Sequence, residues 1–323
     1  MSEKYETIVP SEPDAGERLQ WVSWLRSAAP YVHLHHGRTF VISFAGEVVA
    51  DRTLLNHLVM DVSLIASMGM RVVLVHGSRP QIEELMSLRK LEGQFYKGVR
   101  ITGPQELECV KEACGETRFD IEAAFSQGLP NTPMQHSRIK VVSGNFVTAR
   151  PMGIIDGVDY LHTGVVRKVD AESIQDLLSR GNIVLVSPTG FSPTGEAFNL
   201  TTEDVATAIA VAIHADKLIL SVGVDGVRIQ GEKQQDLTAQ QAQALIQSKQ
   251  VDDEDVYNLG YALRAIKGGV DRVHIVPYAM DGGILTELFT HDGVGTMIST
   301  ENMESLREAT IDDVAAIVKL LEP

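Results

Sequence analysis

Runs of apolar residues alternate with amphipathic stretches along most of this chain. Residues 39–49, 71–77, 182–190 and 216–222 each contain an almost continuous hydrophobic run, which is typical of strands buried on both faces. The segments between them carry apolar residues every three or four positions, the spacing of one helical face. This alternation predicts an α/β protein, a three-layer α/β/α sandwich with a mainly parallel central sheet, over about residues 20–300.

The remaining elements follow from the same two patterns. Helices are predicted at residues 53–70, 104–128, 170–181, 201–215, 259–269 and 282–290, and further strands within 138–151, 272–277 and 295–299. Gly69 is placed to close the first of these helices as a C-cap. The glutamine-rich stretch 231–255 is polar, and we predict that most of it is helical and exposed.

The two ends of the chain differ from this body. Residues 1–18 form a polar leader, and a short helix is predicted at 19–29. Its apolar stripe consists of Trp21, Trp24, Leu25 and Ala28. Pro30 is predicted to end the helix, because a proline pushes the residue before it out of the α region.

The last residues, 301–323, are predicted to contain a linker and the opening of a second domain. Thr310 is a candidate N-cap, with carboxylates in the first turn where they suit the helix dipole. An apolar helical stripe then runs over 314–321.

The composition excludes several classes of binding partner and of site. The formal net charge is −15, which disfavours nucleic acid and anionic membranes, since both bind basic surfaces. Cys109 and Cys114 lie five residues apart, which is not a metal or redox spacing. The polar amino terminus has no signal core and no run of about 18 apolar residues occurs, so we expect a cytoplasmic protein.

The motifs point to one family. The stretches "VVLVHGSRPQI" (72–82), "VVSGNFVTARPMGIIDGVDYLHTGVVRKVD" (141–170), "GEAFNLTTEDVATAIA" (195–210) and "DGGILTELFTHDGVGTMIS" (281–299) resemble the amino-acid-kinase family. They are most similar to its N-acetylglutamate synthase branch, from bacterial arginine biosynthesis. The resemblance runs from about Tyr31 to residue 300 and implies a sandwich of the carbamate-kinase-like type.

The resemblance also implies an activity for the parent enzyme. Such synthases transfer an acetyl group from acetyl-CoA to L-glutamate and are inhibited by L-arginine. The stretch "REATIDDVAAIVKLL" (307–321) resembles the start of a Gcn5-type acetyltransferase domain, which carries the catalysis in these enzymes. We therefore expect no catalytic residue, bound cofactor or metal in this chain, with acetyl-CoA only as a substrate of the parent enzyme.

A kinase-like site remains, but in degenerate form. Phosphoryl transfer depends on glycine-turn amides and fixed cations around the phosphates. Compared with acetylglutamate kinases, Ser43 replaces a lysine, Ala45 a glycine, and Ser78 and Arg79 two glycines. A second lysine has no counterpart by spacing, and the nearest equivalent position is Asn258. The other positions of the degenerate site are Gly46, Gly77, Asn199 and Glu203.

The carboxyl-terminal motif implies an arginine site. In arginine-inhibited relatives this region binds the effector, and the matching positions are His274, Glu287, Asp292, Gly293 and Gly295, with Tyr31 nearby. A fixed carboxylate suits a guanidinium or an ammonium, and turn amides suit a carboxylate.

Three neighbouring histidines and a pair of tryptophans each allow two interpretations. His33, His35 and His36 have no carboxylate or cysteine at ligand spacing, which favours a solvated loop over a metal site. The Trp21 and Trp24 stripe favours docking on a neighbouring subunit, as the resemblance implies, over packing within the chain.

Three functions stay open at this point. The chain is an arginine-sensing domain of an N-acetylglutamate synthase, a working acetylglutamate kinase that uses ATP and magnesium, or a catalytically silent binding and oligomerisation module. The missing lysines and glycines count against the kinase.

Overall fold

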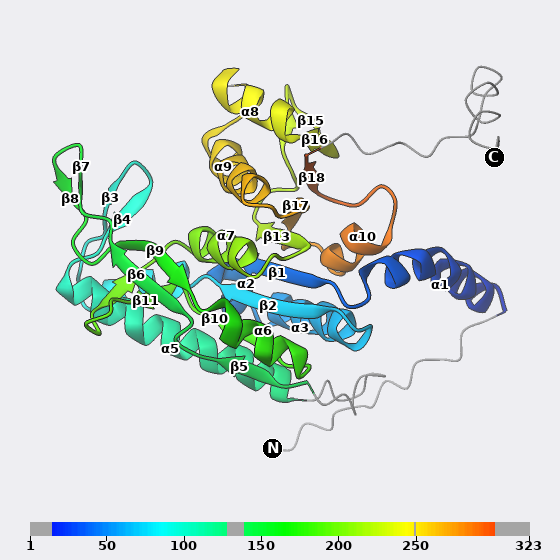
Figure 1. Cartoon of the computed structure of the whole chain (residues 1–323), viewed down its shortest axis with the longest axis horizontal. Helices are drawn as coiled ribbons and strands as arrows, with labels where there is room; N and C mark the ends of the chain where they lie inside the picture. Colours follow the sequence, from blue (N-terminus) through cyan, green and yellow to red (C-terminus); the bar gives the residue numbers. More distant parts are fainter. Residues whose placement is uncertain (1–14, 128–138, 249, 301–323) are drawn as a thin grey trace, which may run out of the picture.

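The computed structural model describes residues 15–127, 139–248 and 250–300 (Figure 1). Most of the predicted leader and the whole of the predicted acetyltransferase opening, 301–323, lie outside these residues.

An eight-stranded sheet forms the middle layer, in the order β16-β18-β17-β13-β1-β2-β10-β5. Its strands are β1 (Thr39–Phe44), β2 (Arg71–His76), β5 (Val141–Ser143), β10 (Ile183–Val186), β13 (Lys217–Val222), β16 (Asp236–Thr238), β17 (Arg272–Pro277) and β18 (Thr296–Ser299). All neighbours pair in parallel except β17 and β18, which are antiparallel. The predicted mainly parallel sheet is confirmed.

Helices cover both faces of the sheet. One hydrophobic cluster joins the sheet to α6 (Ala171–Ser179), α7 (Thr202–Ala212), α8 (Ala239–Ser248) and α9 (Asp253–Lys267). A second joins it to α1 (Ala15–His35), α2 (Gly46–Ala50), α3 (Arg52–Ser67), α5 (Pro104–Ser126) and α10 (Gly283–Phe289). The helix α4 (Arg79–Leu88) packs with α5 in a smaller cluster. The predicted three layers are therefore present.

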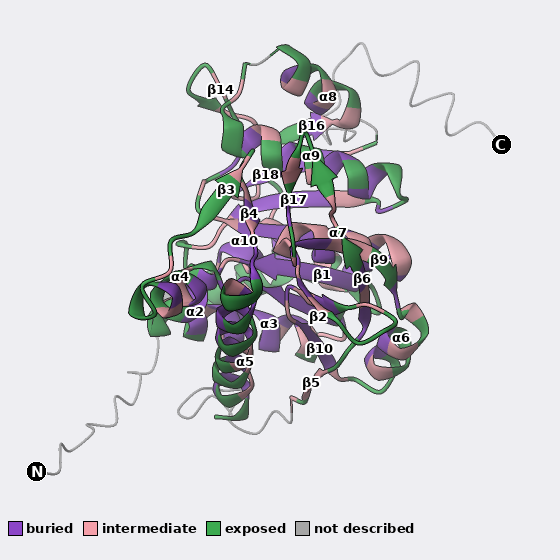
Figure 2. Cartoon of the chain, turned by 90° about the vertical axis from the view of Figure 1, so that its left-hand side faces the viewer, coloured by how far each residue is buried: buried purple, intermediate pink, exposed green. Residues whose placement is uncertain are grey.

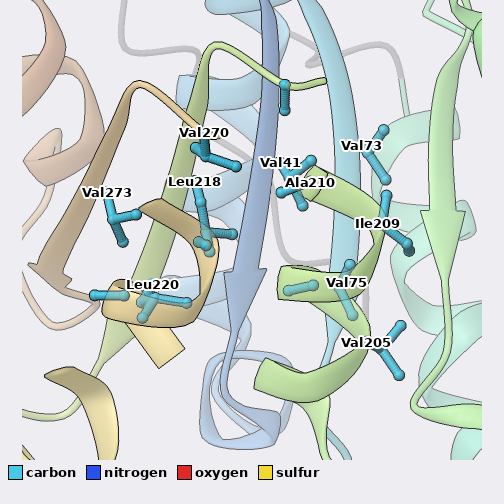
Figure 3. Packing of buried hydrophobic residues seen from close by; sticks show 14 of the residues in the cluster. Val41, Val73, Val75, Val205, Ile209, Ala210, Leu218, Leu220, Val270 and Val273 are labelled. Atoms are coloured by element: carbon cyan, nitrogen blue, oxygen red, sulfur yellow. The ribbon is translucent and has the colours of Figure 1, made fainter. Parts of the chain in front are cut away.

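Alternation along the central strands divides these two cores. In β1, Val41 belongs to the cluster with α7, while Phe40 and Ile42 belong to the cluster with α3. Figure 3 shows Val41 beside Ala210 of α7 and Val73 of β2. Successive side chains of a strand point to opposite faces, so an all-apolar strand supplies both cores, and the central strands are mostly purple in Figure 2.

Smaller sheets accompany the main sheet. The second sheet has the order β12-β11-β6-β9 and pairs β6 (Val147–Pro151) with β9 (Gly164–Val169) and β11 (Thr189–Phe191) with β12 (Ala197–Asn199). The two-stranded hairpins are β3 (Gln94–Tyr96) with β4 (Val99–Ile101), β7 (Ile154–Ile155) with β8 (Val158–Asp159), and β14 (Arg228–Ile229) with β15 (Glu232–Lys233). An ion pair between Lys97 and Asp156 joins the first two hairpins, which project together at the end opposite α1 in Figure 1.

The amino-terminal helix does not end at Pro30 as predicted. The helix α1 continues through Pro30 to His35, although an interior proline removes one helical hydrogen bond and costs about 3 kcal/mol. The added turns are held by tertiary contacts, because Tyr31 and Val32 pack on the core and His35 is buried. The Nε2 atom of His35 lies 3.0 Å from the Leu288 carbonyl oxygen. The prediction of a solvated loop is therefore wrong for His35, and His33, although exposed, also lies in the helix.

The glutamine-rich stretch contains a strand of the main sheet as well as the predicted helix. Residues 236–238 form β16, which adds to the edge of the main sheet beside β18, while 239–248 and 253–255 are helical. The buried Leu237 anchors this strand. Within the described residues, no helix combines the length and the apolar character needed to cross a bilayer.

Candidate functional site

The carboxyl ends of the parallel strands open into a cavity of about 620 Å³. The loops after β1, β2 and β13 line it, together with the starts of α4, α7 and α9 and part of the β3–β4 hairpin. Ligands of open α/β sheets bind at this edge. Eight of the nine predicted kinase-site residues line this cavity: Ala45, Gly46, Gly77, Ser78, Arg79, Asn199, Glu203 and Asn258. The ninth, Ser43, is buried within β1 instead and is not among the lining residues.

The two glycine turns pack on each other. A Cβ on Gly77 would lie 2.8 Å from the Gly46 amide nitrogen, and a Cβ on Gly46 would lie 2.8 Å from Gln81 Oε1. Gln81 Nε2 donates to the Gly46 carbonyl oxygen over 2.9 Å. These glycines are therefore required by the contact between the turns, and the side chain of Gln81 fills the space beside one of them.

The electrostatics of this cavity oppose a nucleotide. The helices α7 and α9 begin here but carry Glu203 and Asp253–Asp255 in their first turns, where these carboxylates occupy the positive end of the helix dipole that would hold a phosphate. Burial and the neighbouring carboxylates Asp204 and Glu47 raise the pKa of Glu203.

Cations are few and already engaged. No lysine is among the described residues that line the cavity, and its two arginines, Arg79 and Arg100, both bond the Glu83 carboxylate, at 3.1 and 3.2 Å. The Asn199 amide donates to Thr102 Oγ1 over 3.0 Å, and the Asn258 amide nitrogen is buried without a hydrogen-bond partner. Among the described lining residues, the cavity therefore offers no unengaged lysine or arginine to neutralise a phosphate.

A buried histidine supports the second turn. His76 is fully buried; its Nε2 lies 2.8 Å from Ser187 Oγ and its Nδ1 3.1 Å from the Gly77 carbonyl oxygen. The carbonyl can only accept, so Nδ1 carries the proton. Burial lowers the pKa of His76 to about 4, which keeps the ring neutral at pH 7.

His76 should make the fold sensitive to acid. Because its pKa is about 4 when folded and near 6.5 when unfolded, its effect on stability is absent above pH 6.5 and grows as the pH falls toward 4. At pH 5 the free energy of unfolding should be lower than at pH 7 by about 2 kcal/mol from His76 alone, at 1.36 kcal/mol per pKa unit. Urea unfolding at pH 7 and 5 should show that His76→Gln loses less stability than wild type by roughly this amount.

An equal loss in both proteins would contradict this assignment. If the variant does not fold, an NMR titration of the wild type provides the test, and the His76 ring should stay neutral at pH 5.

A second cluster lies between β17 and α10. His274 Nδ1 is 2.7 Å from Glu287 Oε1, and Glu287 Oε2 accepts from the amides of Val294 and Gly295, at 2.7 and 2.9 Å. These bonds hold the pKa of Glu287 at about 2 despite its burial. The structure thus brings together four of the predicted arginine-site positions, His274, Glu287, Gly293 and Gly295.

The turn at 292–295 is shaped around this carboxylate. Gly293 has a φ of 60°, and a Cβ there would lie 2.5 Å from Glu287 Oε2, so the position requires glycine. Asp292 is not brought to the cluster, because its side chain is exposed and bonds only His291. Tyr31 packs at the edge of the hydrophobic cluster that includes Val294.

Sequence reasoning missed one member of this cluster, Lys217. Lys217 Nζ lies 3.0 Å from His274 Nε2 and is buried. It lines a cavity of about 630 Å³ at the amino ends of the strands, together with His35, Arg38 and Arg272. A lysine at the start of an apolar strand was the available signal, since lysine is almost never fully buried without a partner.

No metal centre is evident in the part of the chain that the structure describes, where no group of three or more histidine, cysteine or acidic side chains could hold an ion.

Comparison with known proteins identifies relatives of this architecture. Residues 38–277 match the amino acid kinase family. The amino-acid acetyltransferase of Ralstonia nicotianae is 55% identical over 96% of this chain and 69% of its own length. That of Ectopseudomonas mendocina is 48% identical over 94% of this chain and 70% of its own length.

Solved structures agree with these sequence matches. The N-acetylglutamate synthase of Neisseria gonorrhoeae, complexed with coenzyme A and L-arginine, is 35% identical with a TM-score of 0.81, over 93% of this chain and 70% of that one. The carbamate kinase of Giardia lamblia, bound to AMP-PNP, has a TM-score of 0.62 at 14% identity over 82% of this chain and 99% of that one. The second likeness shows the fold alone.

Proposed function

The chain belongs to the amino acid kinase family and is a homologue of the amino-acid acetyltransferases, and from this premise we propose that residues 19–300 are an arginine-sensing regulatory domain. The parent reaction is then acetyl transfer from acetyl-CoA to L-glutamate, the first step of arginine biosynthesis, in the cytoplasm. We assign that chemistry to residues outside 19–300, with 301–323 as the linker and the opening of a Gcn5-type domain.

The observation that carries the proposal is the buried chain Lys217–His274–Glu287. It connects the cavity at the amino ends of the strands to the backbone of the 292–295 turn. A relative with 35% identity is complexed with L-arginine. A ligand that contacts these three hydrogen-bonded side chains can therefore shift the 292–295 turn and α10.

We place L-arginine between α1 and the three hydrogen-bonded side chains Lys217, His274 and Glu287, beside Tyr31. Its carboxylate faces Lys217 and Arg272, and its cationic end faces Glu287 and the 292–295 turn. Both Glu287 oxygens are already bonded within the chain, so arginine must exchange with these bonds. Because of that exchange, the binding free energy of arginine differs between two arrangements of the turn. Regulation between two sites requires such a difference.

Selectivity for L-arginine over L-lysine tests this function. A carboxylate held by two amides presents a planar acceptor that matches a guanidinium fork better than an ammonium. Calorimetric titration of the chain should show arginine binding at least about tenfold more tightly than lysine, or about 1.4 kcal/mol. Equal affinities would count against an arginine sensor.

We also propose that α1 assembles the protein into a homo-oligomer. Trp21 is 62% and Trp24 50% exposed, whereas Ala28 on the same stripe is buried. Two exposed tryptophans at helical spacing are typical of an interface core.

Deleting residues 1–28 should therefore lower the oligomer mass. Light scattering measures this directly, and Trp21→Gln with Trp24→Gln should have the same effect without shortening the chain. An unchanged mass in both variants would show that α1 takes no part in assembly.

A further inference from the structure

Lys217 is a buried lysine beside a cavity. It is the first residue of β13 and only 6% exposed, yet it lines the cavity of about 630 Å³ at the amino ends of the strands. Its Nζ atom lies 3.0 Å from His274 Nε2. A lysine in this position can meet a molecule that enters the cavity.

The partner of Lys217 is arranged as a proton acceptor. His274 Nδ1 lies 2.7 Å from a Glu287 oxygen, and an ionised carboxylate can only accept, so Nδ1 carries the proton. The Nε2 lone pair therefore faces the Lys217 ammonium. The order amine, imidazole, carboxylate is that of an activated nucleophile with its base and orienting group.

The surroundings also favour the neutral amine. Burial and the nearby Arg272 lower the pKa of Lys217 to about 8. At pH 7 about one Lys217 in ten is then neutral, compared with about one in 2,500 for an ordinary lysine of pKa about 10.4. Only the neutral amine is nucleophilic.

We propose that Lys217 Nζ is a site of acylation by activated acyl donors, the thioesters and acyl phosphates. The amine lone pair attacks the acyl carbon, a C–N bond forms, and the C–S or C–O bond breaks with its electron pair leaving on the thiolate or phosphate. The proton lost from nitrogen passes by way of His274 Nε2 to the leaving group or to water.

The cavity is suited to these donors. Arg38 and Arg272 line it beside Lys217, and acyl phosphates and coenzyme A thioesters carry phosphate groups, which arginine binds. Asp216 and Asp271 also line it, and Asp216 is bonded to Arg38 at 2.8 Å, so a phosphate has to displace this ion pair to reach Arg38. Its volume of about 630 Å³ is that of an ordinary small-molecule pocket.

Acylation would have a regulatory consequence, which rests on the proposed arginine site. An acylated lysine has no charge, so the carboxylate of L-arginine would lose one of its cations. The modified protein should then bind arginine about tenfold more weakly, in the range expected for a lost charge-assisted contact.

The test uses the whole chain with either acetyl-CoA or acetyl phosphate at pH 7, followed by peptide mass spectrometry. Exposed lysines of the same chain, Lys168 and Lys267, are internal references. Lys217 should be acetylated at least tenfold faster than either, and this advantage should shrink toward pH 10, where ordinary lysines become neutral. Reaction with one donor only identifies the source, whereas a Lys217 rate no higher than the references with both donors overturns the proposal.

Two variants separate chemistry from exposure. His274→Gln should slow the Lys217 reaction several-fold and alter its pH profile, while Lys168→Arg leaves it unchanged; an unaltered rate and profile in His274→Gln overturns the role of the imidazole. If acetylated protein binds arginine as tightly as unmodified protein, the arginine placement fails while the acylation site stands.

Discussion

Replacing Glu287 by glutamine should weaken L-arginine binding by about 10- to 150-fold. The substitution keeps the shape but removes the charge, and a hydrogen bond to a charged group contributes about 1.5–3 kcal/mol, which converts to this range at 1.4 kcal/mol per tenfold. Calorimetric titration of variant and wild type measures the change.

The structure adds a second reason for this loss. The Glu287 carboxylate accepts from His274 Nδ1 and from two turn amides, whereas an amide side chain has one acceptor oxygen and would present its NH₂ group to one of these donors. The 292–295 turn should loosen as well, so part of the lost affinity would come from a less organised site.

A matched control excludes a general effect of charge. Glu232→Gln makes the same substitution at an exposed position of the β14–β15 hairpin and should leave arginine affinity within about twofold. Wild-type affinity in Glu287→Gln would place the effector site elsewhere.

We also expect that this chain catalyses no phosphotransfer. With N-acetylglutamate and Mg-ATP, the chain should form no ADP above background, because no lysine is among the described residues that line the cavity at the carboxyl ends of the strands, and its two glycine turns pack on each other. Losing one preorganised transition-state contact costs about 10²- to 10³-fold, and two independent losses together cost about 10⁴-fold or more. A coupled ADP assay with hydroxamate trapping of the acyl phosphate measures it.

Restoring the lysine at position 43 should not restore phosphotransfer. Ser43 is buried in β1, so Ser43→Lys alone would not return a usable cation to the cavity. An ADP rate that depends on N-acetylglutamate in the unmodified chain would restore the kinase interpretation.

Hydrophobic patterning was sufficient for the layers and the central strands, because an all-apolar run such as 72–75 can be buried in only a few ways. It failed at Pro30, where tertiary contacts of His35 and Tyr31 outweigh the local cost of a proline in a helix. It failed again at 236–238, where a single buried leucine, Leu237, decides that a polar segment joins the sheet.

The candidate sites were predictable as positions but not as interactions. Eight kinase-site residues converge on one cavity, yet nothing local indicates that Gln81 occupies the space beside Gly46. Glu287 was chosen as a ligand for arginine, but its bonds to the 292–295 turn depend on the fold of that turn. Lys217 is 57 residues from His274 in sequence, and only the parallel pairing of β13 with β17 places the two side by side.

We expect this domain to bind L-arginine and not a nucleotide. Titrating the same preparation with L-arginine and with Mg-ATP in a calorimeter distinguishes the two ligands. We predict saturable heat with about one arginine per chain and no saturable heat with Mg-ATP at the same concentrations. Saturable Mg-ATP binding, or no binding of arginine, would contradict this prediction.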